Sequence, residues 1–498
     1  MHKLWILIAV QATVAAASLV VEIVAGRMLA PYVGMSLYTW TSIIAVVLAG
    51  FSAGHWAGGR LAELSPDQAL RANGWAMLAA ALTTGGALFL LRGVAGPVIT
   101  TFEHPVAVIV VLTTLVFFLP SFFAGIPAPI LSHVAVLRHP DRAGRALGAM
   151  FAAGAWGAIL GTLAAGFVFI SWLGSTGTLV VVTVVYTLLG LHSLWAARGF
   201  GRWMTQGTIA ALVPLALTGA TLTRPDPCSV ESNYFCIRVV EPSGAVAERL
   251  MVLDHLVHGV SVADDPRAML TPHAMMLDGL ARLRMDGRSA WSAFLIGGGN
   301  YALPRAWAAH GAPVDATVAE MDPEVTRIAA EQFWFDPDTA NVIHADARRV
   351  LYQDNASYDI VIGDAFTDIA VPEHLITREF FSLVNDRLNT GGAYIMNVID
   401  HMDRLEALAS VVATAEQVFD VVEVWADPLH DPSEDRRVFI MVAGDAPTPV
   451  SRFTHMHPEA RQVVRVGGAS IRDLVAREST VILTDDYVPI ARLMGARS

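Results

Sequence analysis

The sequence predicts a multi-pass α-helical membrane domain followed by an α/β domain that starts with a small β-hairpin region. Three observations predict it. Residues before 223 are apolar almost throughout, short apolar strands alternate with helical stretches after residue 230, and three of these strands are followed by a carboxylate. We therefore divide the chain into a transmembrane domain (1–223), a small β-rich part (224–285) and the α/β domain proper (286–498).

The composition excludes an ordinary soluble protein. Of the 498 residues, 54% are hydrophobic and only 16% are charged, and the mean hydropathy is +0.50. The formal net charge of −12 and the lack of a basic run argue against a nucleic-acid partner. The partner that the composition indicates is the lipid bilayer.

Seven apolar segments approach the roughly 20 residues that cross about 30 Å of hydrocarbon. The first runs on past Glu22 and Arg27 without a cleavage pattern, so it is not a typical signal peptide. We expect Glu22 and Arg27 to pair near the membrane surface; the alternative is a role in transport. The expected spans are 4–24, 38–60, 73–96, 105–131, 147–171, 176–196 and 205–222.

Basic residues predict how the segments are oriented. They concentrate in alternate loops, which the positive-inside tendency places in the cytoplasm together with Lys3. Seven spans then place everything after residue 223 outside the cytoplasm, so we expect a bacterial inner-membrane protein with a periplasmic domain. The residues concerned are Arg60, Arg71, Arg138, Arg142, Arg145, Arg198 and Arg202.

The two cysteines of the chain follow the last expected span. Cys228 and Cys236 are eight residues apart, a separation that a hairpin could bridge with a disulfide in an oxidising compartment. The alternative is two unrelated buried thiols. A disulfide would agree with the predicted sidedness.

The second half of the chain reads as a hairpin region and then a mainly parallel sheet. Residues 231–241 and 249–260 alternate like antiparallel strands, and a helix is expected around 268–284. Short strands separated by helical stretches follow, which is typical of a parallel sheet covered by helices. These strands lie within 292–298, 312–322, 340–346, 358–366 and 391–399.

The candidate binding residues lie where these strands end, at the sheet edge where ligands bind in such folds. Gly297, Gly298 and Gly299 let a ligand approach the backbone closely. Glu320 ends the next strand, the position at which an acid takes a ribose diol. Asp346, followed by Ala347, could accept from an adenine amino group, and Asp364 ends the fourth strand. Helix caps and loop charges are the structural alternative. A nucleoside such as S-adenosylmethionine fits better than a dinucleotide, because no pyrophosphate-type pattern is present.

These motifs resemble a known family. The stretches ESNYFCIRV, MVLDHLVHG, IGGGN, VAEMD, HADARR and YDIVIGDAFTD are similar, in order and spacing, to the polyamine aminopropyltransferases, or spermidine synthases. The fusion to apolar segments resembles the membrane-anchored branch of that family. The resemblance covers roughly 229–445 and implies a small β-domain followed by a Rossmann-like domain. It also implies transfer of an aminopropyl group from decarboxylated S-adenosylmethionine to an amine, with release of 5′-methylthioadenosine.

The resemblance further implies roles for single residues. Asp364, with Asp368 after it, would accept a proton from the nucleophile or position it. Tyr234, Phe235 and Phe366 could offer an aromatic face to the sulfonium, with packing as the alternative, and His273 would belong to the amine site. We therefore take Asp364, Asn300, Asp368 and Tyr234 as candidate catalytic residues, and we expect no metal and no cofactor beyond the sulfonium substrate.

The sequence also departs from the family pattern. Asn300 stands where an aspartate would hold the ammonium of the decarboxylated donor, and Phe235 stands where a glutamine is expected. Pro272, His273 and Ala274 replace a Tyr-His-Glu segment. Asp368 follows Asp364 after four residues rather than three, and 425–437 replaces the stretch that closes the diamine pocket.

The departures favour an S-adenosylmethionine lyase that releases 5′-methylthioadenosine and homoserine lactone. An aspartate at position 300 would repel the carboxylate of intact S-adenosylmethionine, whereas Asn300 could donate to it. The alternatives are an aminopropyltransferase that uses the decarboxylated donor, a methyltransferase on the same fold, and a transporter or sensor that binds a nucleoside or polyamine. A homodimer is also expected.

Overall fold

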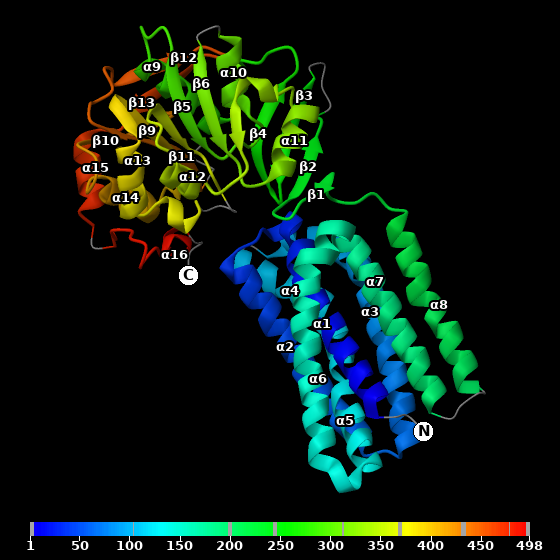
Figure 1. Cartoon of the computed structure of the whole chain (residues 1–498). Helices are drawn as coiled ribbons and strands as arrows, with labels where there is room; N and C mark the ends of the chain where they lie inside the picture. The colour runs from blue at the N-terminus through cyan, green and yellow to red at the C-terminus, as the bar shows by residue number, and fades with distance from the viewer. Residues whose placement is uncertain are drawn as a thin grey trace. The chain divides into compact units, whose positions relative to one another are not determined.

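The computed structural model describes residues 4–102, 104–197, 202–242, 247–310, 313–366, 371–429, 435–477 and 479–494. The chain divides into two compact units, Met1–Cys236 and Ile237–Ser498, which we call the helical unit and the α/β unit (Figure 1).

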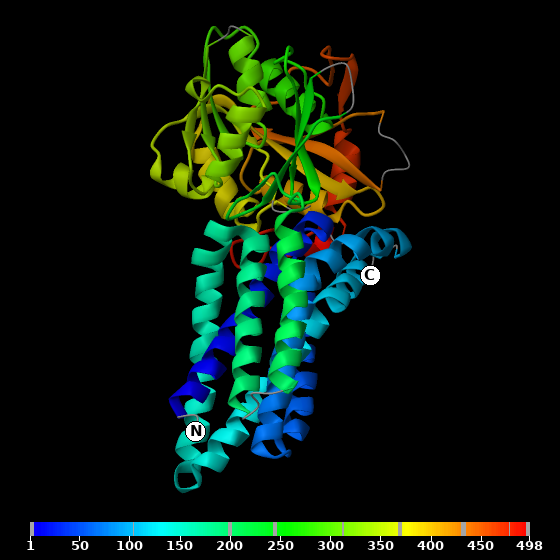
Figure 2. The ribbon, with the colours of Figure 1, turned by 90° about the vertical axis from the view of Figure 1, so that its right-hand side faces the viewer.

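The helical unit is a bundle of long helices that run along one another (Figure 2). Within the bundle α1 packs on α6, α2 on α4 and α3 on α7. Its helices are α1 (Leu4–Val33), α2 (Leu37–Ala62), α3 (Pro66–Thr101), α4 (Pro105–Gly125), α5 (Pro127–Arg138), η1 (Pro140–Arg142), α6 (Ala143–Ala164), the π-helical η2 (Ala165–Ile170), α7 (Ser171–Ala196) and α8 (Arg202–Leu222).

Small residues bring these helices close together. A Cβ atom on Gly54 or Gly58 of α2 would overlap the main-chain oxygens of Phe122 and Ile126. A Cβ atom on Gly157 or Gly161 of α6 would likewise overlap main-chain oxygens of α1. Backbones approach this closely when helices associate through packing, as they do in lipid.

Six helical stretches in the described part of the chain are long and apolar enough to cross a membrane, where the sequence predicted seven. The difference lies in Pro140–Ala196, which counts as one stretch of 57 residues. At 1.5 Å per residue it would extend about 85 Å, far more than one bilayer. Gly174 interrupts it with φ 65° and ψ 179°. The stretch is therefore long enough for two passes, α6 and α7.

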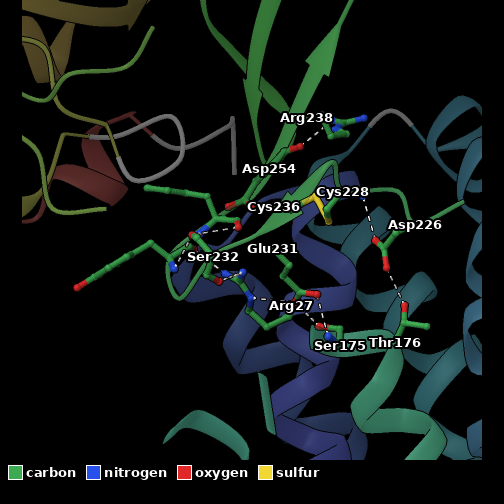
Figure 3. Close-up of a disulfide and its surroundings, with 12 residues drawn as sticks. Arg27, Ser175, Thr176, Asp226, Cys228, Glu231, Ser232, Cys236, Arg238 and Asp254 are labelled. Atoms are coloured by element: carbon green, nitrogen blue, oxygen red, sulfur yellow. Dashed lines mark hydrogen bonds and ion pairs between the residues drawn. A yellow bond between two sulfur atoms is a disulfide. The ribbon is translucent and has the colours of Figure 1, made fainter. Parts of the chain in front are cut away.

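A polar cluster fastens the segment after α8 to the ends of α1 and α7 (Figure 3). Arg27 donates to the main-chain oxygens of Tyr234 at 2.6 Å and Ser232 at 2.7 Å, and its Nε lies 3.5 Å from the Glu231 carboxylate. Glu231 also accepts from the main-chain N–H of Ser175 at 2.8 Å and from its hydroxyl. We call Arg27, Ser175, Glu231, Ser232 and Tyr234 the loop clamp.

Two expectations concern this region: the pair of Glu22 with Arg27, which is wrong, and the disulfide, which is confirmed. Glu22 was expected to pair with Arg27, but the partner of Arg27 is Glu231, which lies beyond the last helix. The expected disulfide is present: Cys228 and Cys236 are bonded, with their Cα atoms 5.2 Å apart. The bond closes the loop that Arg27 holds.

The hairpin region is a four-stranded sheet in the order β1-β2-β3-β4. The sequence predicted one strand over 249–260, but Asp254 takes a positive φ of 53° there and the chain turns. Two antiparallel strands result, which pair Leu253 with Leu256. The strands are β1 (Val230–Glu231), β2 (Cys236–Val240), β3 (Glu248–Leu253) and β4 (Leu256–Val262).

The α/β unit is built around a nine-stranded sheet in the order β12-β13-β10-β11-β9-β8-β5-β6-β7. Strands β7, β6, β5, β8 and β9 pair in parallel, as the sequence predicted. The sheet then continues with antiparallel strands that the sequence analysis did not assign. The strands are β5 (Trp291–Ile296), β6 (Val314–Ala319), β7 (Asn341–Ile343), β8 (Tyr358–Gly363), β9 (Leu388–His401), β10 (Val421–Ala426), β11 (Arg436–Gly444), β12 (Arg452–His455) and β13 (Arg461–Arg465).

Helices pack on this sheet: α9 lies against β9 and β11, α10 against β6, and α13 and α14 against β9. Phe294, Phe380, Phe381 and Tyr394 form a fully buried aromatic core between sheet and helices. The helices are α9 (Pro272–Arg284), α10 (Ala302–Ala309), α11 (Pro323–Gln332), η3 (Pro337–Thr339), α12 (Ala347–Gln353), η4 (Glu373–Leu375), α13 (Arg378–Asp386), α14 (Glu406–Ala415), α15 (Gly468–Val475) and α16 (Ile490–Met494).

Candidate active site

The strand order brings the predicted binding residues to one edge of the sheet. Neighbouring parallel strands β8, β5, β6 and β7 end just before Asp364, Gly297, Glu320 and Asp346, respectively. Because the carboxyl ends of parallel strands share an edge, the three carboxylates and the glycine turn follow one another along it. We call this row the acidic edge.

The glycine turn needs its glycines. Gly297 has a φ of +90°, which a residue with a side chain rarely adopts, and a Cβ atom there would lie 3.1 Å from the main-chain oxygen of Asp364. The Gly298 N–H donates to the Glu320 carboxylate at 2.8 Å. The turn is thus shaped by the two strands on either side of it.

Glu320 is held by the backbone rather than by a cation. Its two carboxylate oxygens accept from the N–H groups of Gly298 at 2.8 Å and Asp322 at 2.9 Å. The side chain is only 7% exposed. Burial raises the pKa of Glu320, and the two N–H donors offset part of that rise. A fixed, buried carboxylate of this kind is a strong acceptor for a diol.

Asp364 is held by one amide and faces one imidazole. Asn397 of β9 donates to it at 2.9 Å, and the Nε2 of His273, at the start of α9, lies 4.0 Å away. Burial raises the pKa of Asp364, although a quarter of its side-chain surface stays open; His273 and Asn397 lower it by a smaller amount. A carboxylate with a raised pKa at a sheet edge is a candidate proton acceptor.

Asp346 is held on both sides. One oxygen caps α12 by accepting from the Arg349 N–H at 2.9 Å, and the other lies 2.7 Å from the Nε2 of His374. Ala347, the first residue of α12, is buried. One oxygen of Asp346 therefore serves as a helix cap, which is the structural alternative expected from the sequence. The second oxygen contacts the His374 side chain.

Asn300 has an internal partner. It is 5% exposed, and its amide nitrogen donates to the Ser261 hydroxyl of β4 at 3.0 Å. A Cβ atom on Gly259 would overlap the Asn300 side chain. Asn300 thus ties the glycine turn to the hairpin region, and a direct bond from it to the substrate stays a prediction.

The structure does not place three other predicted residues relative to the acidic edge. Tyr234 and Phe235 belong to the helical unit, where the main-chain oxygen of Tyr234 accepts from Arg27. Asp368 lies outside the described residues. Their roles toward a sulfonium stay predictions.

The structure adds residues that the sequence analysis did not single out. Asn397 interrupts the apolar run of β9, and that polar residue in a buried strand was a usable signal. His258 of β4 was a weaker one, because a lone histidine in an alternating strand is common. Burial, with smaller effects from His273 and His255, lowers the pKa of His258 to about 4. This imidazole is therefore neutral at pH 7.

No group of three or more His, Cys, Asp or Glu side chains within the described ranges is arranged to hold a metal ion.

Similarity to known proteins agrees with this geometry. Residues 286–445, which contain the whole acidic edge, match the description "Spermine/spermidine synthase domain". In these residues the chain is similar to the spermine/spermidine synthase family. The spermine/spermidine synthase domain therefore begins just before β5 and ends at the end of β11.

Curated relatives resemble the same half of the chain. A probable polyamine aminopropyl transferase of Bifidobacterium longum is 31% identical over 110 residues, which is 22% of this chain and 24% of the relative. A polyamine aminopropyltransferase of Aeropyrum pernix is 27% identical over 255 residues, 49% of this chain and 76% of the relative. The match thus spans a quarter of the first relative and three quarters of the second.

A solved structure is also similar. The probable spermidine synthase from Corynebacterium glutamicum is 23% identical, covers 52% of this chain and 96% of its own, and superposes with a TM-score of 0.46.

Proposed function

We propose that the α/β unit is an aminopropyltransferase. It takes decarboxylated S-adenosylmethionine as donor and an amine as acceptor, and it releases 5′-methylthioadenosine. The observation that carries this proposal is the acidic edge. Its row of carboxylates, Asp364, Glu320 and Asp346, is held mainly by N–H donors and histidines.

Charge favours the decarboxylated donor over intact S-adenosylmethionine. The decarboxylated form carries a sulfonium and an ammonium, both positive, whereas the intact form adds a carboxylate. At an effective dielectric constant of about 20, two like charges 4 Å apart repel by about 4 kcal/mol. His258 adds no positive charge at pH 7, since its pKa is lowered to about 4. This argument outweighs the one from Asn300, whose amide already donates to Ser261.

The reaction needs alignment more than covalent chemistry. The nitrogen lone pair of the acceptor amine forms a bond to the carbon next to the sulfonium. The carbon–sulfur bond breaks, its electron pair stays on sulfur, and the neutral thioether 5′-methylthioadenosine leaves. Asp364 takes the proton that the amine loses, and Asn397 fixes the direction of its carboxylate. His273, within 4.0 Å, is placed to take the proton onward.

The lyase stays as the second candidate. It is favoured by Asn300, which stands where the family pattern has an aspartate for the donor ammonium. In that reaction the carboxylate of S-adenosylmethionine attacks its own γ-carbon, and homoserine lactone leaves with 5′-methylthioadenosine.

One pair of incubations separates the two. The detergent-solubilised full chain is given either decarboxylated S-adenosylmethionine with putrescine or intact S-adenosylmethionine alone, and the products are identified by mass spectrometry. We expect 5′-methylthioadenosine and spermidine from the first mixture only. 5′-Methylthioadenosine with homoserine lactone from the second would establish the lyase instead, and S-adenosylhomocysteine would establish a methyltransferase. Asp364→Asn controls for spontaneous breakdown.

We further propose that the helical unit anchors the enzyme in a bacterial inner membrane, with the α/β unit on the periplasmic side. Three observations support this proposal: six apolar helical stretches, of which Pro140–Ala196 is long enough to cross twice and so gives seven passes, the arginine-rich alternate loops, and the disulfide. Intact cells are treated with a membrane-impermeant maleimide before and after reduction. We expect labelling of Cys228 and Cys236 only after reduction; labelling that requires lysis would place the loop in the cytoplasm.

A further inference from the structure

We propose that His374 sets the base preference of the nucleoside site by fixing the direction of the Asp346 carboxylate. This inference rests on the proposed function, in which Asp346 receives the adenine amino group. His374 acts through Asp346 and is therefore a positioning residue.

The geometry around Asp346 is asymmetric. The Arg349 N–H holds one carboxylate oxygen from the backbone at 2.9 Å, whatever the side chains nearby. The other oxygen is oriented by a side chain, the Nε2 of His374 at 2.7 Å. The side chain of Asp346 is 32% exposed and that of His374 is 46% exposed, so a ligand can reach the carboxylate beside the imidazole. Since each carboxylate oxygen has two acceptor positions, His374 leaves one free on the oxygen it holds.

The main chain of His374 is fastened independently of its imidazole. Arg348 donates to the His374 carbonyl at 3.1 Å and makes a two-pronged pair with Asp485 at 2.7 Å and 2.6 Å. Asp485 also accepts from the Thr377 hydroxyl at 2.7 Å. This C-terminal anchor holds the segment in place. Changing the imidazole therefore tests the orientation of Asp346 without releasing the segment.

An oriented carboxylate distinguishes purines. A carboxylate accepts hydrogen bonds and donates none, so it bonds the exocyclic amine of adenine and repels the oxygen that hypoxanthine carries at the same place. The discrimination between the two bases depends on the Asp346 carboxylate oxygen pointing in one direction. Without His374 only the Arg349 N–H holds the carboxylate. The second oxygen can then turn toward other donors, and the site distinguishes the two bases less.

The test is calorimetry of the full chain in detergent with 5′-methylthioadenosine and 5′-methylthioinosine. We expect the native chain to prefer the adenosine form by at least about tenfold. His374→Ala should reduce this preference severalfold, and His374→Gln, whose amide can donate to the same oxygen, should keep most of it. Asp485→Asn is the matched control: it loosens the C-terminal anchor and should weaken both nucleosides by a similar factor.

Each result has a separate meaning. A native chain that binds neither nucleoside overturns the proposed function itself. If the native chain prefers the adenosine form and His374→Ala keeps the same preference, only the role of His374 is overturned. The same holds if Asp485→Asn changes the preference as much as His374→Ala does, because the effect would then come from the segment as a whole.

Discussion

The acidic edge of the α/β unit and the loop clamp of the helical unit both contain charged side chains near the ends of helices or strands. They differ in how those charges are paired. In the loop clamp, the Arg27 guanidinium meets the Glu231 carboxylate and two main-chain oxygens. In the acidic edge, Asp364 has an amide donor at 2.9 Å and an imidazole only at 4.0 Å.

The pairing of charges distinguishes a structural cluster from a candidate site. Arg27 and Glu231 are 11% and 12% exposed, and opposite charges at such burial stabilise a fold when hydrogen bonds complete them. Asp364 and Glu320 are carboxylates whose pKa burial raises, so their ionised forms are held at some cost to the folded state. Buried carboxylates with a raised pKa are typical of functional sites.

The largest expected effect is on Asp364. Asp364→Asn should lower kcat by about 10³-fold while binding of 5′-methylthioadenosine stays nearly unchanged, because proton acceptance contributes about 10²–10⁴-fold in such reactions. Kinetics and calorimetry measure the two effects. Asp359→Asn is the matched control: Asp359 lies on the same strand and pairs with Arg288 at 2.6 Å, so its loss should leave kcat within a few-fold.

Asp364→Asn also tests the comparison through stability. Because burial raises the folded-state pKa of Asp364 above its unfolded value, the ionised carboxylate destabilises the folded state above that pKa. The variant should therefore unfold at a higher temperature than the native chain at neutral pH, and this advantage should shrink as the pH falls. A lower unfolding temperature at neutral pH would mean that Asp364 belongs to the scaffold.

The loop clamp should respond in the opposite sense. Arg27→Met leaves the Glu231 carboxylate without its cation, and breaking a buried pair costs about 3 kcal/mol. Thermal unfolding of the detergent-solubilised chain should shift down by several degrees. The double variant Arg27→Met with Glu231→Gln should recover part of the loss, since no charge is then left alone. Equal unfolding temperatures for all three chains would remove the scaffold role.

The sequence predicted the acidic edge better than the loop clamp, because the edge follows from local patterns whereas the clamp joins residues far apart in the sequence. Strand period and the position of a carboxylate just after a strand are local, so Glu320, Asp346 and Asp364 could be placed before the strand order was known. The contact of Arg27 with Glu231 joins residues about two hundred positions apart. A nearer charge, Glu22, was the natural partner to expect, and nothing local distinguishes the two.

Two further details needed the structure. The turn within 249–260 depends on the positive φ of Asp254, and the apolar alternation continues through it without a glycine or proline. The partner of Asn300 is Ser261, which lies on a strand of the hairpin region. The sequence pattern assigns Asn300 to the glycine turn, whereas the hydroxyl that accepts from its amide belongs to a strand 39 residues earlier in the chain.

Glu320 should show a smaller effect, on affinity. Glu320→Gln keeps the shape of the side chain but presents an amide nitrogen to one of the two N–H groups that now donate to it, Gly298 or Asp322. It also replaces the charged acceptor proposed for the ribose diol with a neutral amide oxygen. We expect about tenfold weaker binding of 5′-methylthioadenosine, since a charge-assisted hydrogen bond is roughly twice as strong as a neutral one. Equal affinity losses in Glu320→Gln and Asp364→Asn would show that the two roles are not separate.

The smallest expected effect is a shift in the pH profile. If Asp364 accepts the proton, kcat/KM should fall as the pH drops through its pKa, and burial raises that pKa above the roughly 3.9 of an exposed aspartate. Asn397 opposes the rise by donating to the ionised carboxylate at 2.9 Å. Asn397→Ala should therefore move the acid limb of kcat/KM to a still higher pH. A limb that stays in place, or moves to lower pH, would assign that ionisation to another group and leave Asp364, like Glu231, a residue that holds the fold.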